Sequence, residues 1–131
     1  MMLAPEGIAL YVLIVEDDML IALDLELQVE ACGHRVVGMA VDLASCKKSA
    51  RACAPDVALM DLRLKGGECG EDLARWLRGE MGVRCIFVSG NLDEARCARL
   101  RILDPVAFVG KPLLAARLAD ALARVVPETG R

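Results

Sequence analysis

Short apolar runs alternate with segments whose apolar residues recur at helical spacing along nearly the whole chain. The runs are rich in Val, Ile and Leu and are bounded by acidic residues, Gly or Pro, which is typical of buried strands. Strands are therefore predicted over residues 9–15, 35–41, 57–60, 85–88 and 106–109.

Helices are predicted between these strands, over residues 19–32, from Asp42 to about Cys53, and over residues 71–80, 92–103 and 114–125. Asp18 and Asp42 are expected to cap the first two helices, because Asp is favoured at helix N-caps. Gly33 is expected to end the first helix. The segment 92–103 has many charges and a poor apolar stripe, so a marginal and mobile helix is expected there.

Apolar spacing also assigns the buried faces of the first and last helices. In the first helix the residues expected to face the core are Leu20, Leu23, Leu27 and Ala31. In the last helix they are Leu114, Leu118, Ala121, Leu122 and Val125.

Five strands alternating with five helices predict an α/β fold with a parallel sheet covered on both faces. Right-handed crossovers restrict such a chain to a doubly wound, flavodoxin-like sheet, with the expected strand order 2-1-3-4-5. No repeat, linker or low-complexity segment interrupts the pattern. We therefore expect a single domain over residues 1–131, with a core from about residue 10 to 126.

Composition narrows the class of protein. A length of 131 residues suits one domain, and 56% apolar residues exclude a disordered chain. The formal charge of −3 gives no electrostatic footprint for nucleic acid or an anionic membrane. The apolar run 8–15 is too short to span a bilayer and lacks a basic leader, so a cytoplasmic protein is expected.

The cysteines do not form a metal site. None of the six is part of a C-x-x-C pair, and His34 is the single histidine, so zinc-ligand spacing is absent. Their even number leaves a disulfide framework open, but a domain with this apolar content does not need one. Reduced thiols are the expectation.

Chemically active side chains follow the predicted strands. Glu16, Asp17 and Asp18 come after the first strand, Asp61 after the third, Ser89 after the fourth and Lys111 after the fifth. The carboxyl ends of parallel strands share one edge of the sheet, and ligands bind where the strand order reverses. Asp18 is accounted for by helix capping. The remaining acids would repel one another without a cation, and Mg²⁺ suits a site of few carboxylates and several waters.

Two competing sites are disfavoured by the same residues. A nucleotide binder needs a Gly-rich or hydroxyl-rich loop after the first strand, and the acids at 16–18 repel a bare phosphate. A serine hydrolase needs a nucleophile elbow, which Ser89 lacks, and His34 belongs to the wrong end of the sheet.

Four segments resemble the receiver domains of bacterial response regulators in two-component signalling. They are VLIVEDD at 12–18, PDVALMDL at 55–62, FVSG at 87–90 and FVGKP at 108–112, in the family's order and at similar intervals. The stretch 87–92 also partly resembles the fourth strand of stand-alone receivers that partner HWE-type kinases. Each motif is weak alone, whereas four in register cover nearly the whole chain.

The resemblance implies a role for each residue. Asp61 is implied as the phosphoacceptor, with Lys111 pairing with the phosphoryl group and Ser89 hydrogen-bonding to it. The implied Mg²⁺ ligands are Glu16, Asp17, Asp61 and the backbone carbonyl of Arg63, and the implied switch residues are Ser89 and Phe108. Glu16 replaces the more familiar aspartate, and Phe108 lacks the hydroxyl of a tyrosine. Arg63 and Asn91 occupy positions that influence access of water to the phosphoryl group in the family.

The family implies a histidine kinase or phosphotransfer protein as donor and an unidentified downstream protein as target. The chain would be a stoichiometric phosphoacceptor and not an enzyme, either monomeric or a weak homodimer, with a switching face on its fourth helix, last strand and last helix. No output module is expected after Val126, so the expectation is a stand-alone receiver. One alternative is a pseudo-receiver that binds proteins without using the chemistry. A phosphatase-type hydrolase is disfavoured because Arg63 replaces its second acid.

Overall fold

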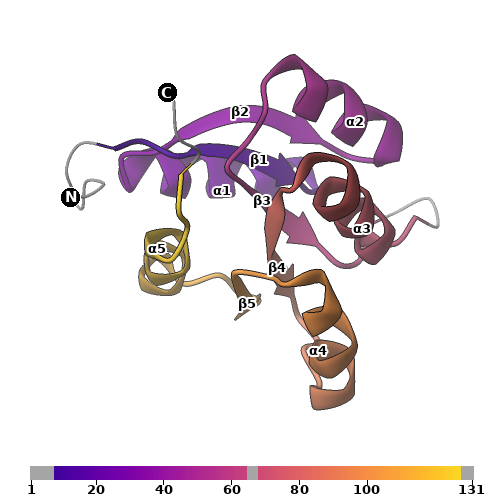
Figure 1. Cartoon of the computed structure of the whole chain (residues 1–131). Coiled ribbons are helices and arrows are strands. Elements are labelled where there is room, and N and C mark those ends of the chain that lie inside the picture. Colours follow the sequence, from indigo (N-terminus) through magenta and orange to yellow (C-terminus); the bar gives the residue numbers. More distant parts are fainter. Residues whose placement is uncertain (1–7, 65–67, 128–131) are drawn as a thin grey trace.

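The computed structural model describes residues 8–64 and 68–127. Five strands and five helices alternate along the chain, as Figure 1 shows. In order they are β1 (Tyr11–Val15), α1 (Met19–Ala31), β2 (Arg35–Ala40), α2 (Leu43–Ala52), β3 (Val57–Asp61), α3 (Gly70–Met81), β4 (Arg84–Ser89), α4 (Glu94–Leu100), a 3₁₀ turn (Arg101–Leu103), β5 (Ala107–Gly110) and α5 (Ala115–Ala123).

The strands form one parallel sheet in the order β2-β1-β3-β4-β5, so the predicted flavodoxin-like topology is confirmed. Helices α1 and α5 lie on one face, and α2, α3 and α4 lie on the other (Figure 1). The order reverses at β1, which pairs with both β2 and β3. The carboxyl ends of β1 and β3 therefore lie side by side, where a ligand site is expected in this fold.

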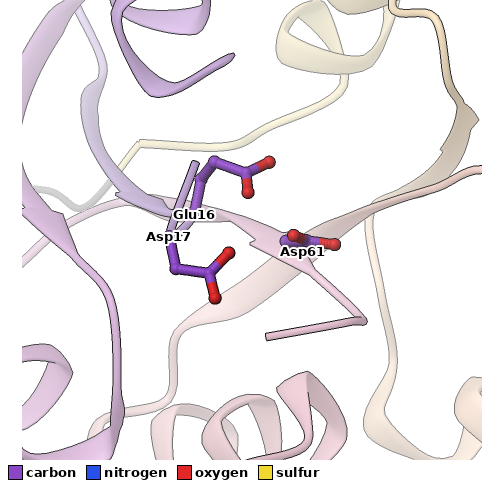
Figure 2. A group of neighbouring side chains, drawn as sticks. All are labelled: Glu16, Asp17 and Asp61. Atoms are coloured by element: carbon purple, nitrogen blue, oxygen red, sulfur yellow. The ribbon is translucent and has the colours of Figure 1, made fainter. Parts of the chain in front are cut away.

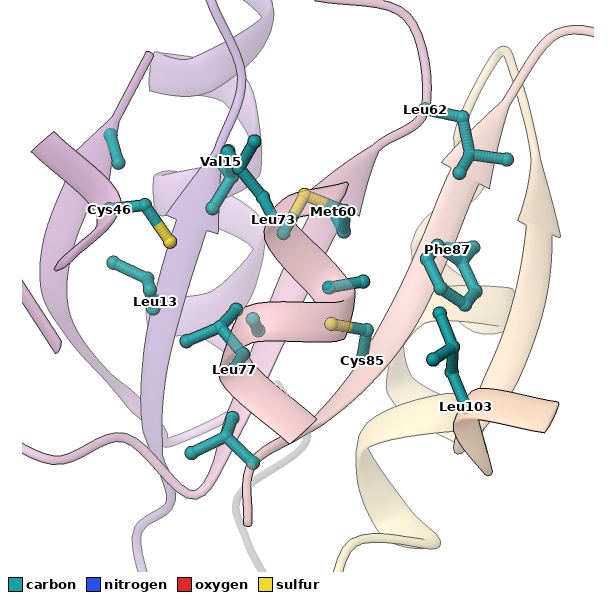
Figure 3. Close-up of a cluster of buried hydrophobic side chains, with 14 of the residues drawn as sticks. Leu13, Val15, Cys46, Met60, Leu62, Leu73, Leu77, Cys85, Phe87 and Leu103 are labelled. Carbon is teal, nitrogen blue, oxygen red and sulfur yellow. The ribbon is translucent and has the colours of Figure 1, made fainter. Parts of the chain in front are cut away.

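Each face of the sheet buries its own apolar cluster, because successive side chains of a strand point to opposite faces. Leu13 and Val15 join the cluster under α2 and α3, whereas Val12 and Ile14 join the cluster under α1 and α5. Figure 3 shows the first cluster, to which β4 contributes Cys85 and Phe87. All five residues of β3 are buried, so the strand that ends at Asp61 is fixed from both sides.

Side-chain caps fix the starts of the first two helices, as predicted. The Asp18 carboxylate accepts hydrogen bonds from the amides of Leu20 and Ile21 at 3.0 and 3.3 Å. Asp42 and Ser45 form a reciprocal capping box on α2. Gly33 follows α1 with φ of +88°, a conformation that glycine adopts without steric cost.

The predicted buried face of α1 is wrong. Leu20 is 79% exposed and Leu27 67%, and Leu23 and Ala31 are exposed as well. The buried residues are Ala22, Leu25 and Val29. The helix has apolar residues on every side, so two stripes compete and periodicity cannot choose between them.

The last two helices also differ from the prediction. Instead of one helix over 92–103, α4 ends at Leu100 and continues as the 3₁₀ turn, which is consistent with the poor apolar stripe. In α5 the residues Leu118, Ala121 and Leu122 are buried as predicted, and Val125 packs against them, but Leu114 precedes the helix and is exposed. Gly66 and Gly67 in the sequence also predict a loop after the third strand, but these two residues lie outside the described part of the chain.

Polar contacts join the helices that cover the second face. The Glu71 carboxylate, on α3, forms ion pairs with Arg75 at 2.9 Å and with Arg99 of α4 at 3.2 Å. On the other side of α3, Lys47 and Arg51 of α2 lie over the ring of Trp76, 5.6 and 5.3 Å from its centroid. These contacts connect α3 to both neighbouring helices.

All six cysteines are free thiols, as expected. Burial raises the pKa of the Cys46 thiol to about 11 and the pKa of Cys85 further still, so both are unreactive core residues. Within the described part of the chain, no helix has the length and apolar character needed to cross a membrane.

Candidate functional site

Three carboxylates converge at the carboxyl edge of the sheet, as Figure 2 shows. Glu16 and Asp17 follow β1, and Asp61 is the last residue of β3. One carboxylate oxygen from each lies within 4.8 Å of the other two. The structure therefore brings together the three acids that the sequence placed in one crevice.

Glu16 is the most buried of the acids, at 4% exposure. Its Oε2 accepts a hydrogen bond from the Asp18 amide at 3.2 Å, and its own amide donates to the Ala40 carbonyl at 3.0 Å. Burial is the main cause that raises the pKa of Glu16, and the neighbouring Asp61 raises it further. The site thus concentrates negative charge that it does not fully neutralise.

Lys111 supplies the cation of the site. Its Nζ lies 3.2 Å from Glu16 Oε1 and 3.4 Å from Asp61 Oδ1, so one ammonium bridges β1 and β3 from the end of β5. The Lys111 amide donates to the Ser89 carbonyl at 2.9 Å, which fixes the backbone. The Lys111–Pro112 bond is cis.

The other residues predicted for the site are Ser89, Arg63 and Phe108. Ser89 ends β4 and is buried, and its hydroxyl accepts a hydrogen bond from the Asn91 amide at 3.1 Å. The amide of Arg63 donates to Asp61 Oδ1 at 3.0 Å. Phe108, in β5, stacks on Phe87 with ring centroids 5.8 Å apart, and the Arg101 guanidinium carbon lies 6.0 Å from the centroid of the Phe108 ring. Phe108 thus lies beside both the core and a surface cation.

The donor set suits a hard divalent cation. Glu16, Asp17 and Asp61 offer only oxygen ligands, and an ion with octahedral geometry can complete its shell with carbonyl oxygen and water. Among the described residues these three form the only group of acids, cysteines or histidines close enough together to hold a metal. Mg²⁺ fits this site better than zinc, which prefers nitrogen and sulfur.

Mg²⁺ is expected to raise the melting temperature of the protein, and to raise it more at pH 8 than at pH 5. A protonated Glu16 is a poor ligand, and its pKa is raised, so the stabilisation is present above that pKa and is lost as the pH falls through it. At a free Mg²⁺ concentration ten times Kd the gain is about 1.4 kcal/mol, or roughly 3–6 °C. Thermal melts with MgCl₂, with chelator and with NaCl of equal ionic strength measure it. An equal shift with NaCl would contradict specific binding.

Glu68 and Gly70, which follow Asp61 in the chain, make contacts that no sequence pattern indicated. The Glu68 carboxylate accepts a hydrogen bond from the Leu43 amide at 2.9 Å, which caps the first turn of α2 from another loop. Gly70 begins α3 directly against the backbone of Asp61, since a Cβ built on it would lie 2.1 Å from the Asp61 carbonyl oxygen. The only signal in the sequence was a glycine at the end of a glycine-rich loop.

A largely apolar groove of about 340 Å³ lies beside the site, between α1 and the end of β5. The exposed side chain of Leu20 lies at this groove, and Lys111 forms part of its wall. Its remaining lining residues are Ile21, Asp24, Leu25, Val88, Pro112 and Leu113. The exposed apolar face of α1 thus leads directly to the ammonium of the site.

Comparison with known proteins adds a family. A family model described as the response regulator receiver domain matches residues 12–123. Phyllosphere-induced regulator PhyR of Methylorubrum extorquens is 28% identical over 116 residues, which are 88% of this chain and 43% of that protein. The chain therefore spans less than half the length of this curated relative.

Solved structures share the fold. The signal receiver domain of a modulated diguanylate cyclase from Desulfovibrio desulfuricans has a TM-score of 0.81 and 29% identity, covering 90% of this chain and 94% of that one. The response regulator PhyR from Brucella abortus has a TM-score of 0.76 and 26% identity, covering 90% and 48%. The receiver domain of Erythrobacter litoralis PhyR has a TM-score of 0.74 and 27% identity, covering 94% and 97%.

Proposed function

The chain belongs to the response regulator receiver domain family, and from that premise we propose that it accepts a phosphoryl group on Asp61 in a Mg²⁺-dependent reaction. The observation that carries the proposal is the position of the Asp61 carboxylate. It is buried, belongs to a trio of acids that suits a divalent cation, and lies 3.4 Å from the Lys111 ammonium. A nucleophile, a metal site and a fixed cation thus meet in one place.

The proposed reaction transfers a phosphoryl group from a phosphohistidine. An oxygen of the Asp61 carboxylate attacks phosphorus, the new P–O bond forms as the P–N bond breaks, and the electron pair leaves with the imidazole nitrogen, which is then protonated. Bound Mg²⁺ would neutralise charge on the phosphoryl oxygens. The Lys111 ammonium, which forms an ion pair with Asp61, shifts to pair with a phosphoryl oxygen, and the Arg63 amide holds the attacking carboxylate in place. The Arg63 carbonyl is proposed as the fourth protein ligand of the metal.

Ser89 and Phe108 are proposed to report the phosphorylated state. Ser89 is the last residue of β4, the strand that pairs with β3 beside Asp61. Its hydroxyl gives up the hydrogen bond from the Asn91 amide and binds a phosphoryl oxygen. That movement shifts the β4–α4 segment and repacks Phe108 against Phe87, favouring a conformation that already exists in a minor population. The face formed by α4, β5 and α5 then binds a downstream protein.

The exposed apolar face of α1 is proposed to dock the donor, a histidine kinase or phosphotransfer protein in the cytoplasm, whose reducing environment suits six free thiols. The argument is position, since the donor's phosphohistidine must reach Asp61 and this face adjoins the groove that Lys111 lines. Leu20 and Leu23 are solvent-exposed large apolar side chains at this end of α1. Such side chains serve as anchors when a partner covers them.

Replacing Leu20 and Leu23 with serine is expected to slow phosphorylation by a protein donor about tenfold or more, because two apolar anchors are lost. Phosphorylation by a small phosphodonor should stay unchanged, since these side chains do not contact Asp61. Both rates are measured with the wild type, with the double variant, and with Ile102→Ser, an exposed apolar residue remote from α1. Equal loss with both donors would show damage to the site and contradict the docking role.

The test of the proposed function is intact mass after incubation with acetyl phosphate and Mg²⁺. One added phosphoryl group, absent when a chelator replaces Mg²⁺, is the expected result. Phosphate released in the same tube is measured alongside, because rapid hydrolysis would conceal the adduct. If the protein gains no phosphoryl group and releases no phosphate, the better account is a pseudo-receiver, a protein-binding module without this chemistry.

A further inference from the structure

The chain returns to Asp61 after leaving it. Beyond β3, Arg63 and Cys69 form a short antiparallel bridge, and α3 starts at Gly70. The Gly70 amide lies 3.4 Å from the Leu62 carbonyl oxygen. The first residue of α3 thus lies directly against the residue that follows Asp61.

This contact leaves no room for a side chain. A Cβ on Gly70 would lie 2.1 Å from the Asp61 carbonyl oxygen, 2.9 Å from Leu62 Cα and 3.0 Å from the Asp61 carbonyl carbon. All three are backbone atoms, so no side-chain rotation relieves the overlap. Either α3 with its preceding loop moves away, or the end of β3 does.

The displaced atoms are those that orient the site. Asp61 holds its carboxylate 3.4 Å from Lys111, and the Arg63 amide fixes the same oxygen at 3.0 Å. Cys69 makes no side-chain cap hydrogen bond at the start of α3, and Gly70 approaches the backbone of Asp61 and Leu62 there. We propose that Gly70 is a positioning residue, which seats α3 against Asp61 and so holds Asp61 and Arg63 in the geometry that binds metal and accepts the phosphoryl group. This inference rests on the proposed function.

The matched control lies in the same helix. Gly79 is exposed and has open space around its Cβ position, with nothing within 4 Å. Gly79→Ala makes the same chemical change as Gly70→Ala, in the same element, without the overlap. It should improve helix propensity and leave the site untouched.

The experiment compares Gly70→Ala, Gly79→Ala and the double variant, each first shown to be folded by circular dichroism. Displacement of about 1 Å costs catalytic sites up to 100-fold in rate. Gly70→Ala is therefore expected to slow phosphorylation by acetyl phosphate about 100-fold and to weaken Mg²⁺ binding about tenfold. In metal-free protein, its amide resonances at Asp61 and Arg63 should shift. Gly79→Ala should match the wild type in its phosphorylation rate, its Mg²⁺ affinity and its amide resonances at Asp61 and Arg63.

The outcomes are distinguishable. A folded Gly70→Ala protein with wild-type Mg²⁺ affinity and unshifted resonances at Asp61 overturns the inference. Failure to fold, even in the double variant with a stabilising osmolyte, also overturns it, because Gly70 would then serve the fold and not the site. If the wild type takes no phosphoryl group, the proposed function fails, whereas the resonances and Mg²⁺ affinity still decide the role of Gly70.

Discussion

Asp61→Asn is expected to gain no phosphoryl group under conditions that load the wild type fully. An amide keeps the shape of the side chain but lacks the nucleophilic oxygen, and among the described residues no other acid has the same position against Lys111 and the Arg63 amide. Glu16 also contacts Lys111, but it is held by the Asp18 amide. Intact mass after treatment with acetyl phosphate and Mg²⁺ measures the loss.

The same substitution should also change the titration of Glu16. Asp61 is one of the causes that raise the pKa of Glu16, so the asparagine variant should move that pKa back toward its ordinary value. Asp72→Asn, an exposed acid in the first turn of α3, is the matched control and should be loaded like the wild type. A phosphoryl group on the Asp61→Asn protein would show that another residue is the acceptor.

Phe87→Ala is expected to remove about 3–5 kcal/mol from the free energy of unfolding, as is usual when a buried phenylalanine is truncated. Phe87 is fully buried in the cluster under α2 and α3, and its ring stacks on Phe108. The free energy of unfolding of a domain is only about 5–15 kcal/mol in total, so the variant should be close to unfolding at 37 °C. Urea titration followed by circular dichroism gives the change.

The control for this variant is Ile102→Ala. Ile102 is 79% exposed, so its truncation should change stability by no more than about 0.5 kcal/mol. If only native packing is affected, the slope of the unfolding free energy against urea concentration should be the same in both variants as in the wild type. A loss below about 1 kcal/mol for Phe87→Ala would mean that the ring does not support the cluster as its burial indicates.

The fold and the proposed site followed from the sequence because both depend on strand order alone. Once five apolar runs alternate with helices, the residues after each run must share one sheet edge, and the structure brings Glu16, Asp17 and Asp61 together there. The strong caps at Asp18 and Asp42 were equally readable, since a capping carboxylate acts within three residues of itself.

Features that depend on packing between distant segments were not predictable. Helix α1 has an apolar residue on nearly every side, so its periodicity did not reveal that Ala22, Leu25 and Val29 are the buried ones. The seating of Gly70 on Asp61 depends on how a loop returns, and no local pattern encodes that. Both were errors or omissions about contacts, not about elements.

Trp76 is the sole tryptophan of the chain, and its indole ring extends from α3 to two cations of α2. The intrinsic fluorescence of the protein therefore comes mainly from one junction between two helices. Any shift of α3 relative to α2 alters the distance of Lys47 and Arg51 from the ring, and with it the emission. Since α3 starts on the backbone of Asp61, the protein carries its own optical probe of that end of the sheet, without a label.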